Sequence, residues 1–160
     1  GRLGWAAAGL VVLGRGFRSP RVLVEAQRVP QISYGAGAVA AQAGATSMID
    51  ISDGLLADLG HVAQASGVLI ELRQGAFEVA EPLQAVAAAT GSDPYTFILT
   101  GGDDHALAAT FPSLDAIPAG WLVIGDVGSA HDDQAGVLVD GTVWEAASGF
   151  DHFRASESRR

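Results

Sequence analysis

The segment at residues 49–56, Ile-Asp-Ile-Ser-Asp-Gly-Leu-Leu, places two carboxylates and a hydroxyl where an apolar run passes into a helical pattern. Asp50 ends the apolar run, and Ser52 and Asp53 precede the helix. Carboxylates three residues apart on one loop can share Mg²⁺ with phosphate oxygens, and the first N–H groups of a helix attract anions. The segment therefore predicts a metal and phosphate site. The alternative is that Ser52 and Asp53 only cap the helix, because Ser and Asp are preferred N-cap residues.

A second candidate is the turn at residues 100–104, Thr-Gly-Gly-Asp-Asp, which leads directly into an apolar strand. Paired glycines permit a tight turn that exposes backbone N–H groups, and Asp103 and Asp104 follow at the entry to the strand. A solvated loop without any ligand has the same composition. Both interpretations therefore stay open for this turn.

A third candidate lies near the end of the chain, where residues 149–153 read Gly-Phe-Asp-His-Phe. The face of an aromatic ring attracts positive charge, so Phe150 could cover a flat cationic ligand. Aromatic residues in such a segment also commonly attach a C-terminal tail to its domain. The two interpretations give Phe150 a role in binding or a role in packing.

The distribution of charge limits the partners of the chain. Eight of the nine arginines lie towards the two ends, and between residues 29 and 153 sixteen acidic residues accompany a single arginine, Arg73, and no lysine. So acidic a body repels phosphate backbones, and we expect no nucleic-acid partner. It also calls for a cation, either a bound metal or a positively charged ligand, unless the acids simply form a solvated surface.

Two residue types are absent from the sequence, and their absence excludes whole classes of chemistry. The chain has no cysteine, which excludes disulfides, thiolate metal sites and cysteine nucleophiles. It has no lysine, which excludes a Walker P-loop and a Schiff-base lysine. No apolar run approaches the ~20 residues of a membrane span, so we expect no membrane partner and no signal peptide.

The elements that must position these residues alternate between strand and helix patterns from residue 46 onward. A helix at residues 54–66 ends at Gly67, and a second, at 82–90, ends at Gly91. Asp140 and Gly141 separate two β-type runs and predict a hairpin turn. The predicted fold class is α+β, with a mixed sheet of about five or six strands covered by about three helices. The expected strands lie at 47–51, 68–72, 106–111, 121–127 and 137–139, with a strand or turn at 96–99.

The order and separation of the three candidate segments resemble one family, the thiamine-monophosphate kinases. Residues 48–59 look like that family's Asp-x-Ser-Asp-Gly-Leu signature, and residues 99–107 look like its Thr-Gly-Gly-Glu-Asp-Tyr-Glu-Leu strand entry. Residues 149–153 resemble its closing Gly-Trp-Asp-His-Phe. The resemblance begins near Ala6 and concerns the C-terminal half of the family. It implies a fold like the C-terminal domain of aminoimidazole-ribonucleotide synthetase.

The resemblance also implies a division of the chain. Residues 1–33 would be a linker or helical lead-in from a missing N-terminal half, residues 34–153 the C-terminal α+β domain, and residues 154–160 a disordered tail. Because the chain opens with Gly1 instead of Met, we expect a fragment that begins partway through a larger protein. In the family, the N-terminal half carries most of the acidic metal ligands and forms a homodimer.

The activity that the resemblance implies is the ATP- and Mg²⁺-dependent phosphorylation of thiamine monophosphate to thiamine diphosphate in the cytoplasm. Position by position, Asp50 and Asp53 would bind Mg²⁺, Ser52 would contact ATP, and Asp103 and Phe150 would bind the substrate. Asp103 stands where the family usually has Glu, and Phe150 where it usually has Trp. No residue of this chain is assigned as catalytic, and we expect the chain alone to be inactive.

Two other functions stay open at this point. Aminoimidazole-ribonucleotide and selenophosphate synthetases share the architecture of the C-terminal half, and fold alone does not separate them from the kinases. Without an N-terminal half, the chain could instead be a non-catalytic acidic module that binds a metal or a ligand. The presence of both motif segments in the family's order favours the kinase, because a generic acidic module does not require them.

Overall fold

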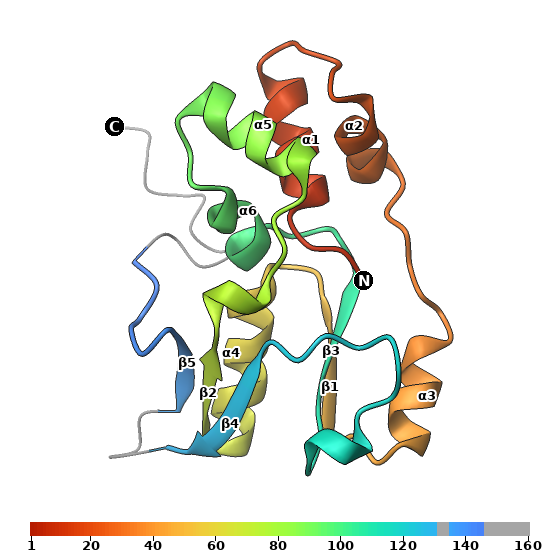
Figure 1. Cartoon of the computed structure of the whole chain (residues 1–160), viewed down its shortest axis with the longest axis vertical. Coiled ribbons are helices and arrows are strands. Elements are labelled where there is room, and N and C mark those ends of the chain that lie inside the picture. Colours follow the sequence, from red (N-terminus) through yellow and green to blue (C-terminus); the bar gives the residue numbers. More distant parts are fainter. Residues whose placement is uncertain (131–134, 146–160) are drawn as a thin grey trace, which may run out of the picture.

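The computed structural model describes residues 1–130 and 135–145 of the chain (Figure 1). These residues form six α-helices, five β-strands and two short 3₁₀-helices, the latter at Gln74–Ala76 and Leu114–Ala116. The predicted α+β fold class is confirmed. The helices are α1 (Trp5–Gly14), α2 (Arg21–Arg28), α3 (Ala36–Gln42), α4 (Leu55–Ser66), α5 (Glu81–Thr90) and α6 (Pro94–Thr100). The strands are β1 (Ser47–Ile51), β2 (Val68–Leu72), β3 (Ala106–Thr110), β4 (Gly125–Ser129) and β5 (Gly136–Val139).

The five strands form two sheets in the described part of the chain, where the sequence predicts one mixed sheet. β1 and β3 pair antiparallel, and β2 is the centre of a three-stranded sheet, antiparallel to β4 and parallel to β5. Helix α4 packs against β1 of the first sheet and against β2 and β5 of the second. Local patterns identify strands, but pairing depends on contacts between distant residues, so the division into two sheets is not visible in the sequence.

Two elements differ from the expectation. Residues 96–99, predicted as a strand or turn, belong to helix α6, and the strand predicted to begin at Trp121 begins at Gly125. The Asp93 side chain caps α6 by accepting the Tyr95 N–H at 2.9 Å, and Pro94 occupies the first helical position. Asp followed by Pro is a helix-start signal, and it outweighs the β-type residues that follow.

Predictions that rest on turn residues are confirmed. Helix α4 ends at Gly67 with φ of 63°, and α5 ends at Gly91 with φ of 69°, both in the left-handed conformation. Asp140 and Gly141 have φ of 47° and 79°, as a type I′ turn requires. The turn is closed by a bridge between the residues that flank it, Val139 and Thr142.

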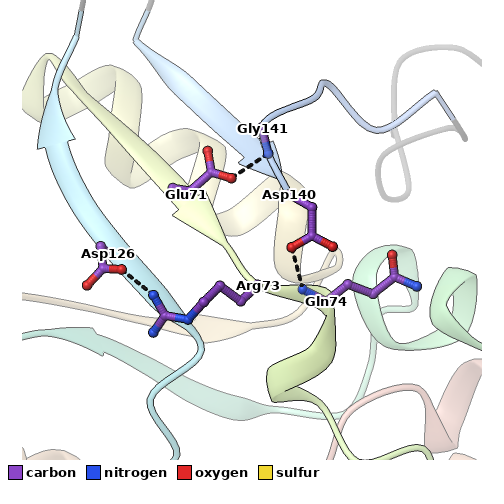
Figure 2. A network of polar contacts seen from close by, with 6 residues as sticks. All are labelled: Glu71, Arg73, Gln74, Asp126, Asp140 and Gly141. Carbon is purple, nitrogen blue, oxygen red and sulfur yellow. Dashed lines mark hydrogen bonds and ion pairs between the residues drawn. The ribbon is translucent and has the colours of Figure 1, made fainter.

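The polar contacts at the end of β2 hold this turn in place (Figure 2). The Glu71 carboxylate accepts the Gly141 N–H at 2.5 Å, and the Asp140 carboxylate accepts the Gln74 N–H at 3.2 Å. Arg73 pairs with Asp126 on the neighbouring strand β4. Carboxylates therefore fix the turn mainly through backbone N–H groups, since Arg73 is the single arginine in this part of the sequence, which has no lysine.

The hydrophobic core is one cluster that receives residues from both sheets and from the first two helices. Helices α1 and α2 lie against each other, with α5 and α6, at one end of the molecule (Figure 1). A Cβ on Gly9 of α1 would collide with the Leu23 carbonyl oxygen of α2, so only glycine allows this approach. Among the described residues, no helix combines the length and apolar character that a membrane span needs. The fully buried large side chains are Leu23, Ile51, Leu55, Leu72, Leu83 and Leu99.

Asp104 joins the second motif to the start of α1. Its side chain is buried, with 6% exposed, and its two oxygens accept the N–H groups of Gly4 and Ala6, the latter at 2.9 Å. Burial raises the pKa of Asp104 above 3.8, although the backbone hydrogen bonds and the charge of Arg2 act in the opposite direction. The segment before the first helix is therefore fixed to the turn that carries Asp103.

The close contact of α1 with α2 predicts that a Gly→Ala substitution lowers the free energy of unfolding in α1, whereas the same substitution raises it in α4. Gly9→Ala places a methyl group against the Leu23 backbone, and we expect a loss of about 2 kcal/mol or more in the free energy of unfolding. The control is Gly60→Ala in α4, where a Cβ meets nothing within 4 Å. There we expect a gain of about 0.5–1 kcal/mol, because Ala favours a helix over Gly. Urea unfolding of both variants measures the difference, and equal effects would contradict it.

The raised pKa of Asp104 predicts a pH dependence of stability. A carboxyl with a folded pKa above its unfolded value favours folding below the unfolded value of 3.8, and this contribution is lost as pH rises through the folded pKa. Asp104→Asn removes the titration. The difference in unfolding free energy between wild type and Asp104→Asn should therefore shrink with rising pH in urea titrations. If the difference in unfolding free energy stays constant as the pH rises from below 3.8, the raised pKa of Asp104 is contradicted.

Candidate functional site

The two predicted motifs lie side by side where β1 ends and β3 begins. The strands pair with Asp50 opposite Leu107 and Ile51 opposite Ala106. Beyond the last pair the contact continues, because His105 donates its N–H to the Ile51 carbonyl at 3.0 Å and Asp103 donates its N–H to the Ser52 carbonyl at 2.9 Å. Two segments about fifty residues apart in sequence thus form one pair of loops, which we call the motif loops: residues 50–54 and 101–105.

Glycines allow the motif loops to touch through their backbones. A Cβ on Gly102 would collide with the Ser52 carbonyl oxygen. Gly54 has φ of +123°, and a Cβ there would lie 2.6 Å from the Thr100 carbonyl oxygen. Any other residue at either position would push the loops apart. Gly54 and Gly102 therefore serve the contact between the two segments.

Asp58 holds the first motif loop from the helix that follows it. One of its carboxylate oxygens, Oδ2, accepts the N–H groups of Ser52, Asp53 and Gly54, at 2.9, 3.1 and 3.2 Å. Asp58 itself is 3% exposed and lies in the first turns of α4, whose N-cap is Gly54, a residue without a side chain. The acceptor for these loop N–H groups is thus supplied by the helix, in the manner of a capping box.

Asp58 was not among the residues predicted for the site, although the sequence carries a signal for it. It lies three residues after Leu55 and four before Val62, which places a charged residue inside the apolar stripe of the helix. A buried carboxylate needs hydrogen-bond donors, and the nearest are the N–H groups of the loop. The pattern therefore indicates a capping role that an inspection of loop residues alone does not reveal.

Four of the five predicted site residues lie on the motif loops. Asp50 and Asp103 are exposed, and Ser52 and Asp53 are half-buried. Asp103 has φ of 64°, a left-handed conformation that Asp tolerates better than most residues. The fifth residue, Phe150, lies outside the described residues.

Asp50 lies next to His105, a contact that the sequence patterns do not predict. The Nδ1 atom of His105 lies 3.6 Å from Oδ2 of Asp50, and both side chains are partly exposed. His105 adopts φ of 50°, so the backbone of the second motif loop turns its side chain towards β1. A protonated His105 would compete with a metal ion for the Asp50 carboxylate.

The motif loops offer Mg²⁺ the right type of donor in a small number. Within residues 1–130 and 135–145, no group of three or more His, Cys, Asp or Glu side chains is arranged to hold a metal ion. Mg²⁺ is usually bound through one or two carboxylates, waters and substrate phosphates. Asp50 and Asp53 fit that mode of binding, in which most of the ligands come from phosphate, water and other parts of a larger site.

A cavity of about 860 Å³ opens beside the motif loops, between the two sheets. Asp50 and His105 line it from the β1–β3 pair, and Ile70 and Ile124 line it from the side of the second sheet. Leu59 of α4 contributes to the wall. Its size and its predominantly apolar lining are typical of sites for small organic molecules.

Comparison of sequences finds curated thiamine-monophosphate kinases. The relative from Mycobacterium tuberculosis strain H37Rv is 47% identical over 154 residues, which cover 96% of this chain and 45% of the relative. The relative from Corynebacterium glutamicum is 39% identical over 140 residues, which cover 83% of this chain and 41% of the relative. The chain thus spans less than half the length of these two relatives. No protein-family model matches it.

Comparison of structures agrees with the comparison of sequences. The structure of AaThiL complexed with AMPPCP and TMP matches with a TM-score of 0.82 and 31% identity, over 96% of this chain and 49% of that one. A crystal structure of thiamine monophosphate kinase from Aquifex aeolicus matches with a TM-score of 0.76 and 30% identity, over 89% and 48% of the two chains. The resemblance inferred from the motifs is confirmed: the chain is similar to thiamine-monophosphate kinases over about half of their length.

Proposed function

We propose that the chain is the C-terminal half of a thiamine-monophosphate kinase, which transfers the terminal phosphoryl group of ATP to thiamine monophosphate. The observation that carries the proposal is the pairing of the motif loops, which brings Asp50, Ser52, Asp53 and Asp103 to one place. The relative complexed with AMPPCP and TMP supports it, because its fold extends over 96% of this chain. The complete enzyme consists of this chain joined to an N-terminal half of the family's kind.

The first motif loop binds Mg²⁺ and the phosphates of ATP. Asp50 and Asp53 hold Mg²⁺, and the Ser52 hydroxyl contacts ATP next to the N-terminus of α4. When bound, Mg²⁺ neutralises charge on the phosphates, which is the main requirement of phosphoryl transfer. The protein's own contribution is to keep the two carboxylates and the hydroxyl at fixed positions, because small displacements are costly in such reactions.

The second motif loop binds thiamine monophosphate. Asp103 is exposed next to Ser52 and is one methylene shorter than the Glu that the family usually has, so the substrate must approach this loop closely. Phe150, outside the described residues, is proposed on the resemblance alone, as an aromatic face for a cationic ring. The cavity lined by Asp50 and His105 gives an organic substrate room beside both loops.

The remaining parts of the proposal concern the whole protein. The complete enzyme is a homodimer that assembles through its N-terminal half, and it acts in the cytoplasm. The related synthetases and a non-catalytic acidic module are not favoured by any specific observation, since the curated relatives reported above are thiamine-monophosphate kinases.

The small number of ligands predicts that the 160-residue chain does not turn over thiamine monophosphate by itself. Phosphoryl transfer needs metals and both substrates in one arrangement, and two carboxylates with one hydroxyl do not assemble it. A coupled assay of ADP release measures turnover for the chain and for the complete enzyme. We expect activity only in the complete enzyme. Robust Mg²⁺-dependent formation of thiamine diphosphate by the chain alone would contradict this.

The metal role of Asp53 predicts a large effect of Asp53→Asn in the complete enzyme. Asn keeps the size of the side chain and caps helices as well as Asp, but it carries no charge for Mg²⁺. We expect kcat to fall at least about a hundredfold, or about 3 kcal/mol of transition-state stabilisation.

The matched control is Asp115→Asn, which removes one acidic charge from an exposed position in the short helix Leu114–Ala116. Steady-state kinetics of both variants, at temperatures where each is folded, isolate the local effect. Near-normal kcat for Asp53→Asn would contradict the proposed metal role of this residue.

A further inference from the structure

Asp58 is connected to the second motif loop through the backbone of one residue, Ser52. The N–H of Ser52 donates to Asp58 at 2.9 Å, and the carbonyl of the same residue accepts the N–H of Asp103 at 2.9 Å. The N–H groups of Asp53 and Gly54 also donate to Asp58. The first loop is thus held from both sides, by the helix through its N–H groups and by the second loop through its carbonyls.

Among residues 1–130 and 135–145, the charge of Asp58 is stabilised by the N–H groups of the loop and by no cation. In the described part of the chain, none of the ion pairs includes Asp58. Three converging N–H dipoles are a substitute for a cation, but only while the loop keeps its conformation. Movement of the loop would leave a carboxylate buried without donors, and this penalty opposes the movement.

We propose that Asp58 is the positioning residue of the proposed metal and nucleotide site, because it fixes the loop that carries Asp50, Ser52 and Asp53 without itself contacting a ligand. This inference rests on the proposed function, in which these three residues bind Mg²⁺ and ATP. Asp58 is buried beneath the loop and points its acceptor oxygen at the backbone. Its effect on binding is therefore exerted through the loop conformation.

The geometry supplies a variant that separates position from charge. All three N–H groups converge on the same oxygen, Oδ2, so the carbonyl oxygen of Asn can accept them from the same place. Asp58→Asn therefore keeps the loop in position, whereas Asp58→Ala leaves the three donors without an acceptor. Rescue by Asn is not expected if Asp58 acts mainly as a charge.

The kinetic experiment compares the two variants in the complete enzyme, at temperatures where melting curves show each to be folded. For Asp58→Ala we expect kcat/KM for ATP to fall about a hundredfold, as a displacement of about 1 Å can cause, and the Mg²⁺ concentration for half-maximal rate to rise. Asp58→Asn should stay within about threefold of wild type. Glu71→Ala is the control, since Glu71 also binds a backbone N–H but at the distant turn of residues 140–141. It should change the melting temperature alone.

A second measurement reports on the loop without metal or nucleotide. Amide hydrogen exchange of the 160-residue chain, followed by NMR, should show faster exchange at Ser52, Asp53 and Gly54 in Asp58→Ala and retained protection in Asp58→Asn. Unchanged kinetics in Asp58→Ala would overturn the inference, as would equal losses in both variants. If the unmutated complete enzyme lacks kinase activity, the proposed function fails and the inference fails with it.

Discussion

The interaction on which the site depends is the convergence of three backbone N–H groups on one buried carboxylate oxygen of Asp58. The chain uses this kind of contact repeatedly, because sixteen acids between residues 29 and 153 have a single arginine and no lysine among them. Asp104 binds the start of α1, Glu71 binds the turn after β5, and Asp140 in that turn accepts the N–H of Gln74. In each case a carboxylate finds its donors in the backbone and fixes a loop or a helix start. An acidic composition is thus compatible with a defined fold, because backbone dipoles take the place of cations.

These contacts explain how a small fold presents exposed carboxylates at defined positions. Asp50 and Asp103 are exposed, but the backbones that carry them belong to the β1–β3 pair and its extension. Gly54 and Gly102 allow the two loops to touch, and Asp58 and Asp104 anchor them to α4 and α1. Residues that bind metal and phosphate need such rigidity, because a flexible loop would have to be ordered at each binding event, at a cost in free energy.

Much of the fold could be predicted from local sequence, and its arrangement in space could not. The ends of α4 and α5 follow from Gly67 and Gly91, and the strands β1 and β2 from short apolar runs. Helix α6 was predicted wrongly because its β-type residues conceal the capping signal of Asp93, and the two sheets differ from the one expected because pairing is a long-range property. Four candidate site residues could be named from motifs, but the buried residues that hold their loops in position could not. The role of Asp58 depends on which donors a buried charge meets in the folded chain.

The most direct test of the account is the location of the metal ions in a crystal of the complete enzyme, soaked with Mn²⁺ and a non-hydrolysable ATP analogue. Anomalous scattering locates Mn²⁺, which stands in for Mg²⁺, independently of any activity. The account predicts Mn²⁺ within about 2–2.5 Å of carboxylate oxygens of both Asp50 and Asp53, and next to the phosphates of the analogue. The three N–H groups of the loop should still donate to Asp58 in that structure. Ions bound only by other residues, with Asp50 and Asp53 directed away from the phosphates, would contradict it.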